Sequence, residues 1–165
     1  MKRRHFLGLV GAGGIVGLIP GLALARPKPD LKRAAGLEVL ELSEAEWRER
    51  LTEAQFDILR KEGTEPAFSS PLDKETREGE FHCAGCDLVL FTSAMKYDSG
   101  TGWPSFFEHV EGHLLSKVDY KAIWPRTEYH CARCGGHQGH VFEDGPAPTG
   151  LRWCNNGLAL RFVPA

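Results

Sequence analysis

The stretches Cys83-Ala84-Gly85-Cys86 and Cys131-Ala132-Arg133-Cys134 decide the fold of this chain. Two such C-x-x-C pairs, when a β fold brings them together, make the tetrahedral four-cysteine site that is typical of structural zinc. The four cysteines are therefore predicted to bind one Zn²⁺ ion. The pairs lie further apart than those of a minimal zinc ribbon, so folding of the chain between them must close the site. Four thiolates leave no open coordination position, and we expect the metal to hold the fold rather than to perform a reaction.

The same pairs allow a second interpretation, as redox-active cysteines or structural disulfides, both of which occur in oxidising compartments. A thioredoxin-like C-x-x-C pair opens a helix within a βαβ unit, and neither pair here lies in such a pattern. The N-terminal sequence, described below, is typical of proteins that are exported in a folded state. Such export also favours zinc, because the metal can bind before the thiols meet an oxidant. Zinc is the preferred prediction.

Short strands are predicted around and after these pairs. From about Gly79 onward, apolar runs alternate with glycine-rich or proline-rich loops such as 98–104 and 145–150. The expected strands are 88–91, 118–124, 128–131, 140–142 and 151–163, and the alternation of Leu158, Leu160 and Phe162 turns the last one toward the core. No repeat and no helix–strand alternation is present. The fold class is therefore mainly β, a small antiparallel barrel or sandwich.

Two helix starts precede this β region. Ser43-Glu44-Ala45-Glu46 and Thr52-Glu53-Ala54-Gln55 are both capping boxes, and each has apolar residues placed for a hydrophobic staple. Gly63 is expected to end the second helix. Both helices are predicted to be a structural layer.

The first 25 residues have the layout of a secretory signal. Residues 1–4 are basic, residues 6–25 are apolar and rich in glycine, and Ala23-Leu24-Ala25 fits a cleavage site. The run Arg3-Arg4-His5-Phe6-Leu7 resembles a twin-arginine signal, which exports folded proteins. We therefore expect residues 1–25 to be a signal peptide, residues 26–37 a linker and residues 38–165 the functional domain, located in a bacterial periplasm. The alternative is an uncleaved membrane anchor, and only this segment is expected to touch a membrane.

Charge argues against a nucleic-acid partner. The whole chain has a formal net charge of −2, and cleavage of the signal would remove three further cations. A mildly acidic domain without a basic stripe is a poor nucleic-acid binder.

Cys154 is the fifth cysteine of the chain and belongs to neither C-x-x-C pair. An unpaired cysteine in an exported protein is either a buried inert thiol or a reactive one. If a strand begins at Leu151, then Arg152, Cys154 and Asn156 share one face of it, because side chains alternate along a strand. A guanidinium beside a thiol favours the nucleophilic thiolate, so Cys154 is predicted to be reactive.

Three further stretches complete a pattern: residues 97–106 (YDSGTGWPSF), 137–146 (HQGHVFEDGP) and 152–156 (RWCNN). With them, the chain from about Val39 to its end resembles the B-type peptide methionine sulfoxide reductases, which reduce the R epimer. The resemblance implies two antiparallel β-sheets with the N-terminal helices outside them and zinc remote from the active site. It also implies methionine sulfoxide in oxidised proteins or peptides as the substrate, since the family's pocket is shallow.

The resemblance implies roles for individual residues. Cys154 matches the catalytic nucleophile, and His140 and His137 match two histidines beside it. Arg152 and Asn156 match polar residues that flank the nucleophile, and Asp144 matches a carboxylate near the histidines. Trp103 matches the residue that forms the wall of the substrate pocket around the methyl group, and Phe142 matches a second substrate-binding residue. Each has a plainer alternative: Trp103 as a packing residue, the histidines as core residues or ligands of a second metal, and Arg152 with Asp144 as a surface ion pair. Their combination favours the catalytic interpretation.

The chemistry of a sulfoxide supports these roles. Its sulfur is electrophilic and its oxygen basic, so attack requires a thiolate, a proton donor and an apolar socket for the methyl group. Cys154, His140 and Trp103 supply these three types. The reaction leaves Cys154 as a sulfenic acid, which a reductant must restore.

Several residues depart from the family pattern. Thr101 stands where many relatives have the cysteine that resolves the sulfenic acid, so we expect no internal disulfide and direct reduction by a small thiol or a thioredoxin-like protein. Asn155 replaces an apolar β-branched residue, Gln138 replaces a leucine, and Gly157-Leu158 replaces Ser-Ala. Asn156-Gly157 is a hairpin-turn signal, but the resemblance favours a strand that continues through it.

Two other functions remain open at this point. One is a zinc-stabilised module that binds a peptide at Trp103 without catalysis; the presence of Cys154 and Arg152 argues against it. The other is a periplasmic thiol oxidoreductase that uses the C-x-x-C pairs, which a zinc measurement would separate from the zinc site.

Overall fold

The computed structural model describes residues 31–121 and 125–165. The predicted signal peptide, residues 1–25, lies outside the described residues. Within the described part of the expected linker, Leu31 and Leu37 pack against the core, and Arg33 Nε donates to the Ala132 carbonyl at 2.8 Å. Residues 31–37 therefore lie against the domain. Across the described residues, no helix combines the length and the apolar character needed to cross a bilayer.

Two antiparallel sheets form the body of the domain, which confirms the predicted fold class. The smaller sheet has the order β2-β1-β9, with β1 (Gly79–Cys83), β2 (Val89–Thr92) and β9 (Leu160–Pro164). The larger sheet has the order β3-β4-β8-β7-β6-β5, with β3 (Lys96–Tyr97), β4 (Ser105–Phe106), β5 (Leu114–Asp119), β6 (Arg126–Cys131), β7 (His137–Phe142) and β8 (Arg152–Asn155). Along the chain, β1 and β2 of the smaller sheet precede all six strands of the larger sheet, and β9 follows them. The smaller sheet is therefore completed by pairing of the last strand with the first one.

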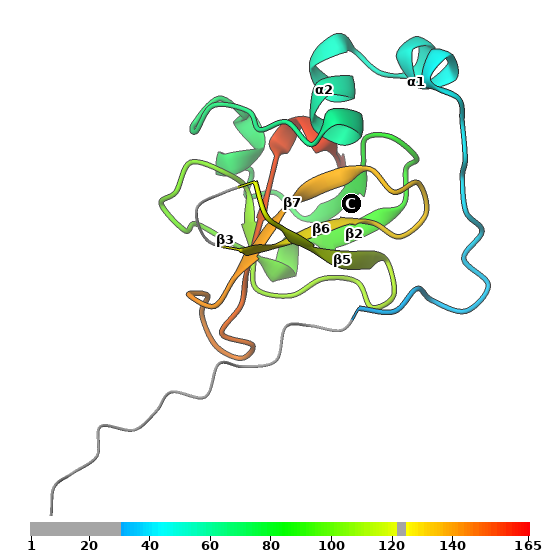
Figure 1. Cartoon of the computed structure of the whole chain (residues 1–165). Helices are drawn as coiled ribbons and strands as arrows, with labels where there is room; N and C mark the ends of the chain where they lie inside the picture. The colour runs from blue at the N-terminus through cyan, green and yellow to red at the C-terminus, as the bar shows by residue number, and fades with distance from the viewer. Residues whose placement is uncertain (1–30, 122–124) are drawn as a thin grey trace, which may run out of the picture.

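Helices α1 (Glu44–Arg50) and α2 (Glu53–Lys61) lie at one end of this body (Figure 1). Both predicted capping boxes are present. The left-handed residue that ends α2 is Glu62, with φ of 57°, one residue before the predicted Gly63. Trp47 of α1 and Phe56 and Leu59 of α2 are buried, so the helices form a packing layer as expected.

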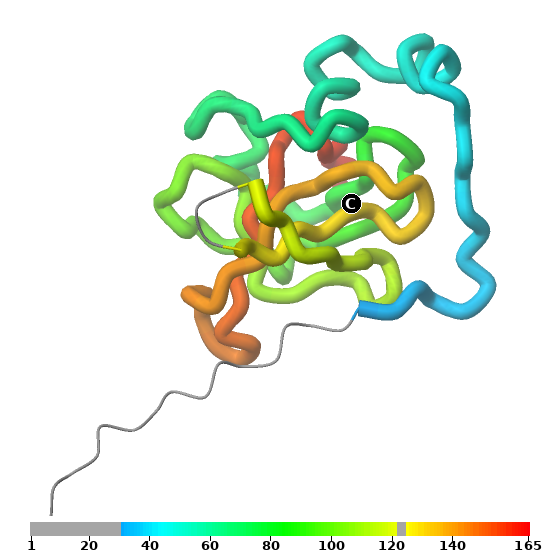
Figure 2. The backbone as a smooth tube through the Cα atoms, in the orientation of Figure 1, coloured from blue at the N-terminus to red at the C-terminus, as the bar shows by residue number. Residues whose placement is uncertain are grey.

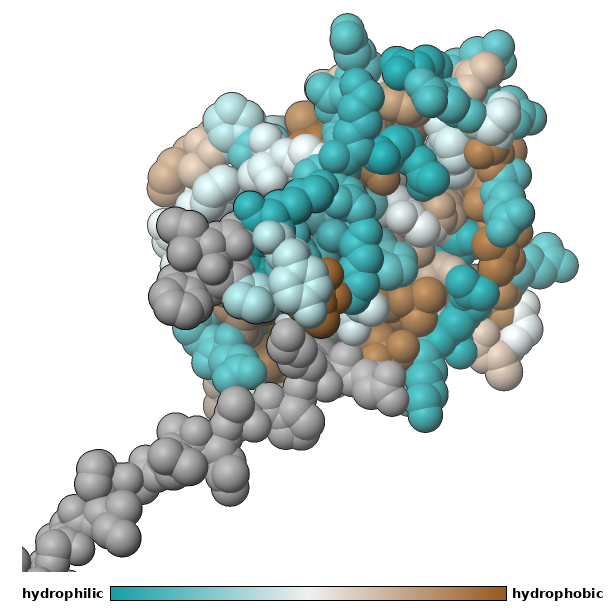
Figure 3. Space-filling model, viewed as in Figure 1, coloured by the Kyte–Doolittle hydropathy of each residue, from teal (hydrophilic) through white to brown (hydrophobic). Residues whose placement is uncertain are grey.

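Three 3₁₀ segments occur among the described residues: η1 (Pro71–Lys74) lies between α2 and β1, η2 (Ser93–Met95) between β2 and β3, and η3 (Gly157–Ala159) between β8 and β9. In the tube view, the chain ahead of α1 runs along the outside of the domain, and the loop that joins β7 to β8 projects from the opposite end to the helices (Figure 2). Hydrophilic side chains cover much of the α1–α2 region and the neighbouring part of the same face (Figure 3).

The core is aromatic and lies between the sheets. Phe91 of β2 stacks on Phe106 of β4 with 4.0 Å between ring centroids, and Phe81 of β1 meets the edge of Phe106 at 5.0 Å. Tyr129 of β6 contacts Trp153 of β8 edge to face at 5.0 Å. The contacts of Phe106 with Phe81 and Phe91 join the two sheets and fix the distance between them.

The predicted strand 151–163 is wrong as a single element. It is divided into β8, η3 and β9, and β8 and β9 belong to different sheets. The Asn156-Gly157 turn signal therefore outweighs the family expectation of continuity. Leu158 lies in η3 and is 39% exposed, so it is not part of the core-facing alternation. The predicted strand 118–124 is also displaced, since β5 spans Leu114–Asp119 and residues 122–124 are not described.

Two glycines are required by close approach in this region. A Cβ on Gly139 of β7 would lie 1.9 Å from the carbonyl oxygen of Cys154 on β8. A Cβ on Gly157 would lie 1.9 Å from Ser70 Oγ. Glycine at these positions lets η1 and β7 lie directly against the segment that contains Cys154.

Candidate active site and metal site

An open pocket of about 120 Å³ lies over the centre of the larger sheet. Its lining includes Trp103, His140, Phe142, Cys154 and Asn156. These residues come from β7, from β8 and its end, and from the loop before β4. The larger sheet therefore gathers five of the eight residues predicted for catalysis and substrate binding, and the pocket also includes Arg126.

Cys154 lies in the middle of β8, between β4 and β7. It pairs with Ser105 on one side and with His140 on the other. Burial raises the pKa of the Cys154 thiol above its ordinary value, while Arg152 and a hydrogen bond with Thr101 act in the opposite direction. The sequence-based expectation that Arg152 makes Cys154 a thiolate is thus outweighed by burial, and the free site favours the protonated thiol near neutral pH.

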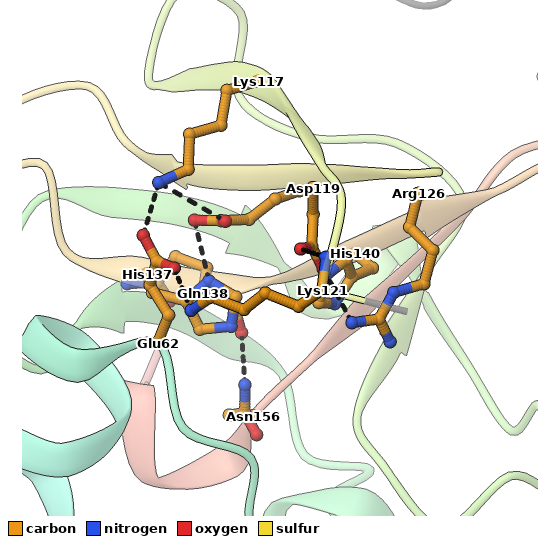
Figure 4. A network of polar contacts seen from close by, with 10 residues as sticks. Glu62, Lys117, Asp119, Lys121, Arg126, His137, Gln138, His140 and Asn156 are labelled. Atoms are coloured by element: carbon orange, nitrogen blue, oxygen red, sulfur yellow. Dashed lines mark hydrogen bonds and ion pairs between the residues drawn. The ribbon is translucent and has the colours of Figure 1, made fainter. Parts of the chain in front are cut away.

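His140 faces Cys154 across the β7–β8 pair and is held from behind by Asp119. His140 Nε2 lies 2.8 Å from Asp119 Oδ2, and Arg126 Nη2 contacts the same oxygen at 2.6 Å (Figure 4). The Lys121 backbone amide, with help from His140 and Arg126, keeps the pKa of Asp119 well below its usual range. An ionised carboxylate only accepts hydrogen bonds, so Nε2 carries the proton and neutral His140 presents a bare Nδ1.

Burial also lowers the pKa of His140, although the Asp119 hydrogen bond acts against this. The imidazole is therefore neutral at neutral pH. A neutral imidazole whose second nitrogen is oriented by a carboxylate is the arrangement that takes a proton from a nucleophile.

His137 lies behind His140 instead of in the pocket lining. Its ring is 2% exposed, its centroid is 5.5 Å from that of His140, and its Nδ1 is 2.9 Å from Glu128 Oε1. Both ring nitrogens of His137 are buried, and neither forms a hydrogen bond with the residues that the structure describes. Figure 4 shows that Glu62 and Lys117 continue this polar contact chain outward from His137.

Trp103 is oriented by Glu65, a residue that the sequence did not point to. Trp103 Nε1 donates to the Glu65 carbonyl at 3.2 Å. The buried Glu65 carboxylate accepts from the backbone amides of Gly157 and Leu158, at the start of η3, and the Glu65 amide donates to Asn156 Oδ1 at 3.1 Å. Glu65 therefore ties the indole, Asn156 and the chain after Cys154 into one arrangement.

Arg152 and Asp144 form a bidentate ion pair, with Nε–Oδ1 of 2.8 Å and Nη2–Oδ2 of 2.9 Å. The Arg152 guanidinium also lies 4.3 Å above the Phe142 ring. Asp144 thus contacts Arg152 rather than the histidines, as the plainer alternative suggested, and the carboxylate on His140 is that of Asp119. No sequence signal marks Asp119 or Arg126, since they meet His140 only through the alignment of three strands.

The four remaining cysteines form a buried cluster where β1 of the smaller sheet and β6 of the larger sheet end. Their sulfur atoms all lie within 4.8 Å of one another, with 3.7 Å between Cys83 and Cys134 and 3.5 Å between Cys86 and Cys131. No pair among these cysteines is a disulfide. The predicted ligands are therefore brought together and are positioned to bind a metal ion.

Comparison with known proteins gives one consistent result. The model of the SelR domain family matches residues 51–164. The chain is 51% identical over 123 residues to the peptide methionine sulfoxide reductase MsrB of Agrobacterium fabrum, covering 74% of this chain and 91% of that protein. It is 49% identical over 121 residues to the MsrB of Leptospira interrogans, covering 73% and 92%, and 46% identical over 137 residues to the MsrB of Bradyrhizobium diazoefficiens, covering 82% and 99%.

Proposed function

Because this chain belongs to the SelR domain family, that of the MsrB peptide methionine sulfoxide reductases, we propose that it reduces the R epimer of methionine sulfoxide in oxidised proteins or peptides to methionine. The observation that carries the mechanism is the cross-strand pairing of Cys154 with His140, whose Nε2 is held by Asp119.

In the proposed reaction, Cys154 attacks the sulfoxide sulfur. His140 Nδ1 takes the thiol proton as the bond between Cys154 Sγ and the substrate sulfur forms, and it passes this proton to the sulfoxide oxygen. The hydroxyl group then moves with its bonding pair from the substrate sulfur to Cys154 Sγ, while the bond between the two sulfur atoms breaks and leaves its electron pair on the substrate sulfur. Cys154 becomes a sulfenic acid, and methionine is released. Atoms balance without an external proton, because the thiol supplies the hydrogen that the oxygen receives. Cys154 is oxidised by two electrons and the substrate is reduced by two.

The walls of the pocket supply orientation. Trp103 and Phe142 offer apolar faces suited to the S-methyl group, and Asn156 fixes the chain after the nucleophile. Arg152 stabilises the thiolate as it forms, since it already lowers the pKa of Cys154 against the effect of burial. We assign His137 to the support of His140, because its ring lies directly behind it.

Zn²⁺ is the metal that we propose for the four-cysteine site. Tetrahedral Zn–S bonds of about 2.3 Å place sulfur atoms about 3.8 Å apart, close to the 3.7 Å between Cys83 and Cys134 and the 3.5 Å between Cys86 and Cys131. Zinc bound there would supply structural stability and no chemical step. Cys83, Cys86, Cys131 and Cys134 would hold it as thiolates.

Recycling of Cys154 is proposed to use an external thiol, either a small molecule or a thioredoxin-like protein. The residue that hydrogen-bonds to Cys154 from its loop is Thr101, which is not redox-active. Residues 1–25 remain proposed as a twin-arginine signal that directs the protein to the periplasm.

The decisive test supplies the purified protein with a mixture of the two epimers of a methionine sulfoxide peptide and a dithiol reductant. Selective loss of the R epimer by the wild type, absent in Cys154→Ser, would support the proposal. Persistence of both epimers with the wild type would refute it.

A further inference from the structure

Two buried amide side chains link the metal cluster to the segment that contains Cys154. Gln138 of β7 and Asn155 of β8 are both fully buried. They occupy two positions where the sequence departs from the family's apolar pattern. Buried amides require hydrogen-bond partners, and these two find them in each other, with Asn155 Nδ2 donating to Gln138 Oε1 at 3.3 Å.

The surroundings determine which way each amide points. Asn155 Nδ2 also lies 2.8 Å from the Asn156 carbonyl, which only accepts, so this atom must be the nitrogen. Asn155 Oδ1 accepts from the Tyr129 hydroxyl at 2.8 Å. Gln138 must therefore turn its oxygen toward Asn155 and its nitrogen the other way.

The Gln138 nitrogen meets a metal-site cysteine. Gln138 Nε2 donates to Cys83 Sγ at 3.4 Å. An N–H donor beside a metal-bound thiolate stabilises its negative charge, and outer partners of this kind contribute to metal affinity. The forced orientation of the amide thus provides the donor that such a thiolate requires.

Gln138 also contacts the segment that follows Cys154, through its backbone carbonyl. The backbone carbonyl of Gln138 accepts from the Asn156 backbone amide at 2.8 Å and from Asn156 Nδ2 at 3.0 Å (Figure 4). Asn155 follows Cys154 directly, and Asn156 lines the pocket. Gln138 and Asn155 therefore contact both the metal cluster and the residues after the nucleophile.

We propose that Gln138 and Asn155 are positioning residues that couple the metal site to the active-site segment, with the Gln138 amide stabilising the metal-bound Cys83 thiolate and Asn155 holding that amide in its donor orientation. The inference rests on the metal binding proposed above. Loss of the Gln138 donor is therefore expected to weaken metal binding, and so is loss of the Asn155 contact that orients this donor, although Asn155 touches no metal ligand.

The first test is transfer of zinc to a chelator from the purified, zinc-loaded protein. Gln138→Leu is expected to weaken zinc binding by about 10- to 100-fold. Val141→Ala, on the same strand and in the core, is the control for general destabilisation and should retain zinc more tightly than Gln138→Leu. Equal zinc affinity in Gln138→Leu and the wild type would overturn the amide contact.

The second test addresses the coupling. Asn155→Val, placed in a Tyr129→Phe background so that no hydroxyl is left unpaired, is expected to weaken zinc binding about fivefold or more relative to Tyr129→Phe alone. Unchanged binding would overturn the coupling through Asn155. A wild type that binds no zinc would refute the metal site itself, whereas equal zinc affinities with intact zinc content would refute only the coupling.

Discussion

His140 on β7 is the direct cross-strand neighbour of Cys154 on β8. Directly opposed residues of an antiparallel pair have Cβ atoms about 5 Å apart and point to the same face. Because His140 Nε2 is bonded to Asp119 at 2.8 Å, Nδ1 is the nitrogen left for the pocket. The thiol, imidazole and carboxylate that we propose as the reactive unit therefore come from three strands of one sheet.

Asp119→Asn is predicted to slow the reaction without preventing substrate binding in the pocket. An amide in place of the carboxylate can donate to Nε2, which favours the His140 tautomer with its proton on Nδ1 and removes the proton acceptor. We expect kcat/KM to fall by about 10²-fold or more. Steady-state kinetics with a sulfoxide peptide checks this, and Glu128→Gln, which alters the contact to His137 instead, is the comparison. Wild-type kcat/KM in Asp119→Asn would remove Asp119 from the mechanism.

The pH dependence of kcat/KM is predicted to be a broad bell. His140 must be neutral, and its pKa is lowered from 6.5, so activity is lost only as the pH falls below that value. Cys154 must carry its proton, and its pKa is raised from 9.0, so the alkaline limb lies above that value. Arg152→Gln should move the alkaline limb higher still. An optimum confined to pH values below 6.5 would indicate an imidazolium–thiolate pair and contradict this assignment.

Thr101→Cys is predicted to create an internal resolving step that the wild type lacks. Thr101 hydrogen-bonds to Cys154, so a thiol at this position would meet the sulfenic acid. After one turnover without reductant, mass spectrometry of peptides should show a disulfide between residues 101 and 154 in the variant. The wild type should show no disulfide from Cys154 to any cysteine of its own chain, and detection of one would contradict direct recycling.

Glu65→Ala is predicted to destabilise the fold as well as the pocket. The substitution leaves the buried amide of Gly157 and the partly buried amide of Leu158 without the carboxylate that accepts from them. Loss of hydrogen bonds to a buried charged group should lower the free energy of unfolding by about 2–3 kcal/mol. Glu44→Ala, which removes an exposed pair with Arg48, should cost less than about 1 kcal/mol. Chemical denaturation measures both, and equal losses would contradict the role of Glu65.

Local signals in the sequence account for much of the fold. Capping boxes marked the starts of α1 and α2 correctly, because their hydrogen bonds join residues three apart. The cysteine pairs indicated the metal site, because thiolates in this pattern have few other uses. The Asn156-Gly157 signal predicts the end of the strand correctly, but no hairpin forms there, because β8 and β9 belong to different sheets.

The remainder depends on long-range register. Asp119 reaches His140 only because β5, β6 and β7 align, and no local pattern encodes that contact. Glu65 lies in an irregular segment whose partners are about ninety residues away. Asp144 was placed near the histidines by resemblance, whereas its carboxylate contacts Arg152. The roles of residues that depend on such long-range contacts can be assigned only from the folded structure.

The central claim is that Cys154 receives the oxygen atom of the sulfoxide, and a single turnover without reductant tests it most directly. One equivalent of methionine should form per chain, and a sulfenic-acid trap followed by peptide mass spectrometry should find the trap adduct on Cys154 alone. Cys154→Ser should form no methionine while retaining its zinc. Methionine formation by that variant, or the oxygen on a cysteine of the cluster, would contradict the mechanism.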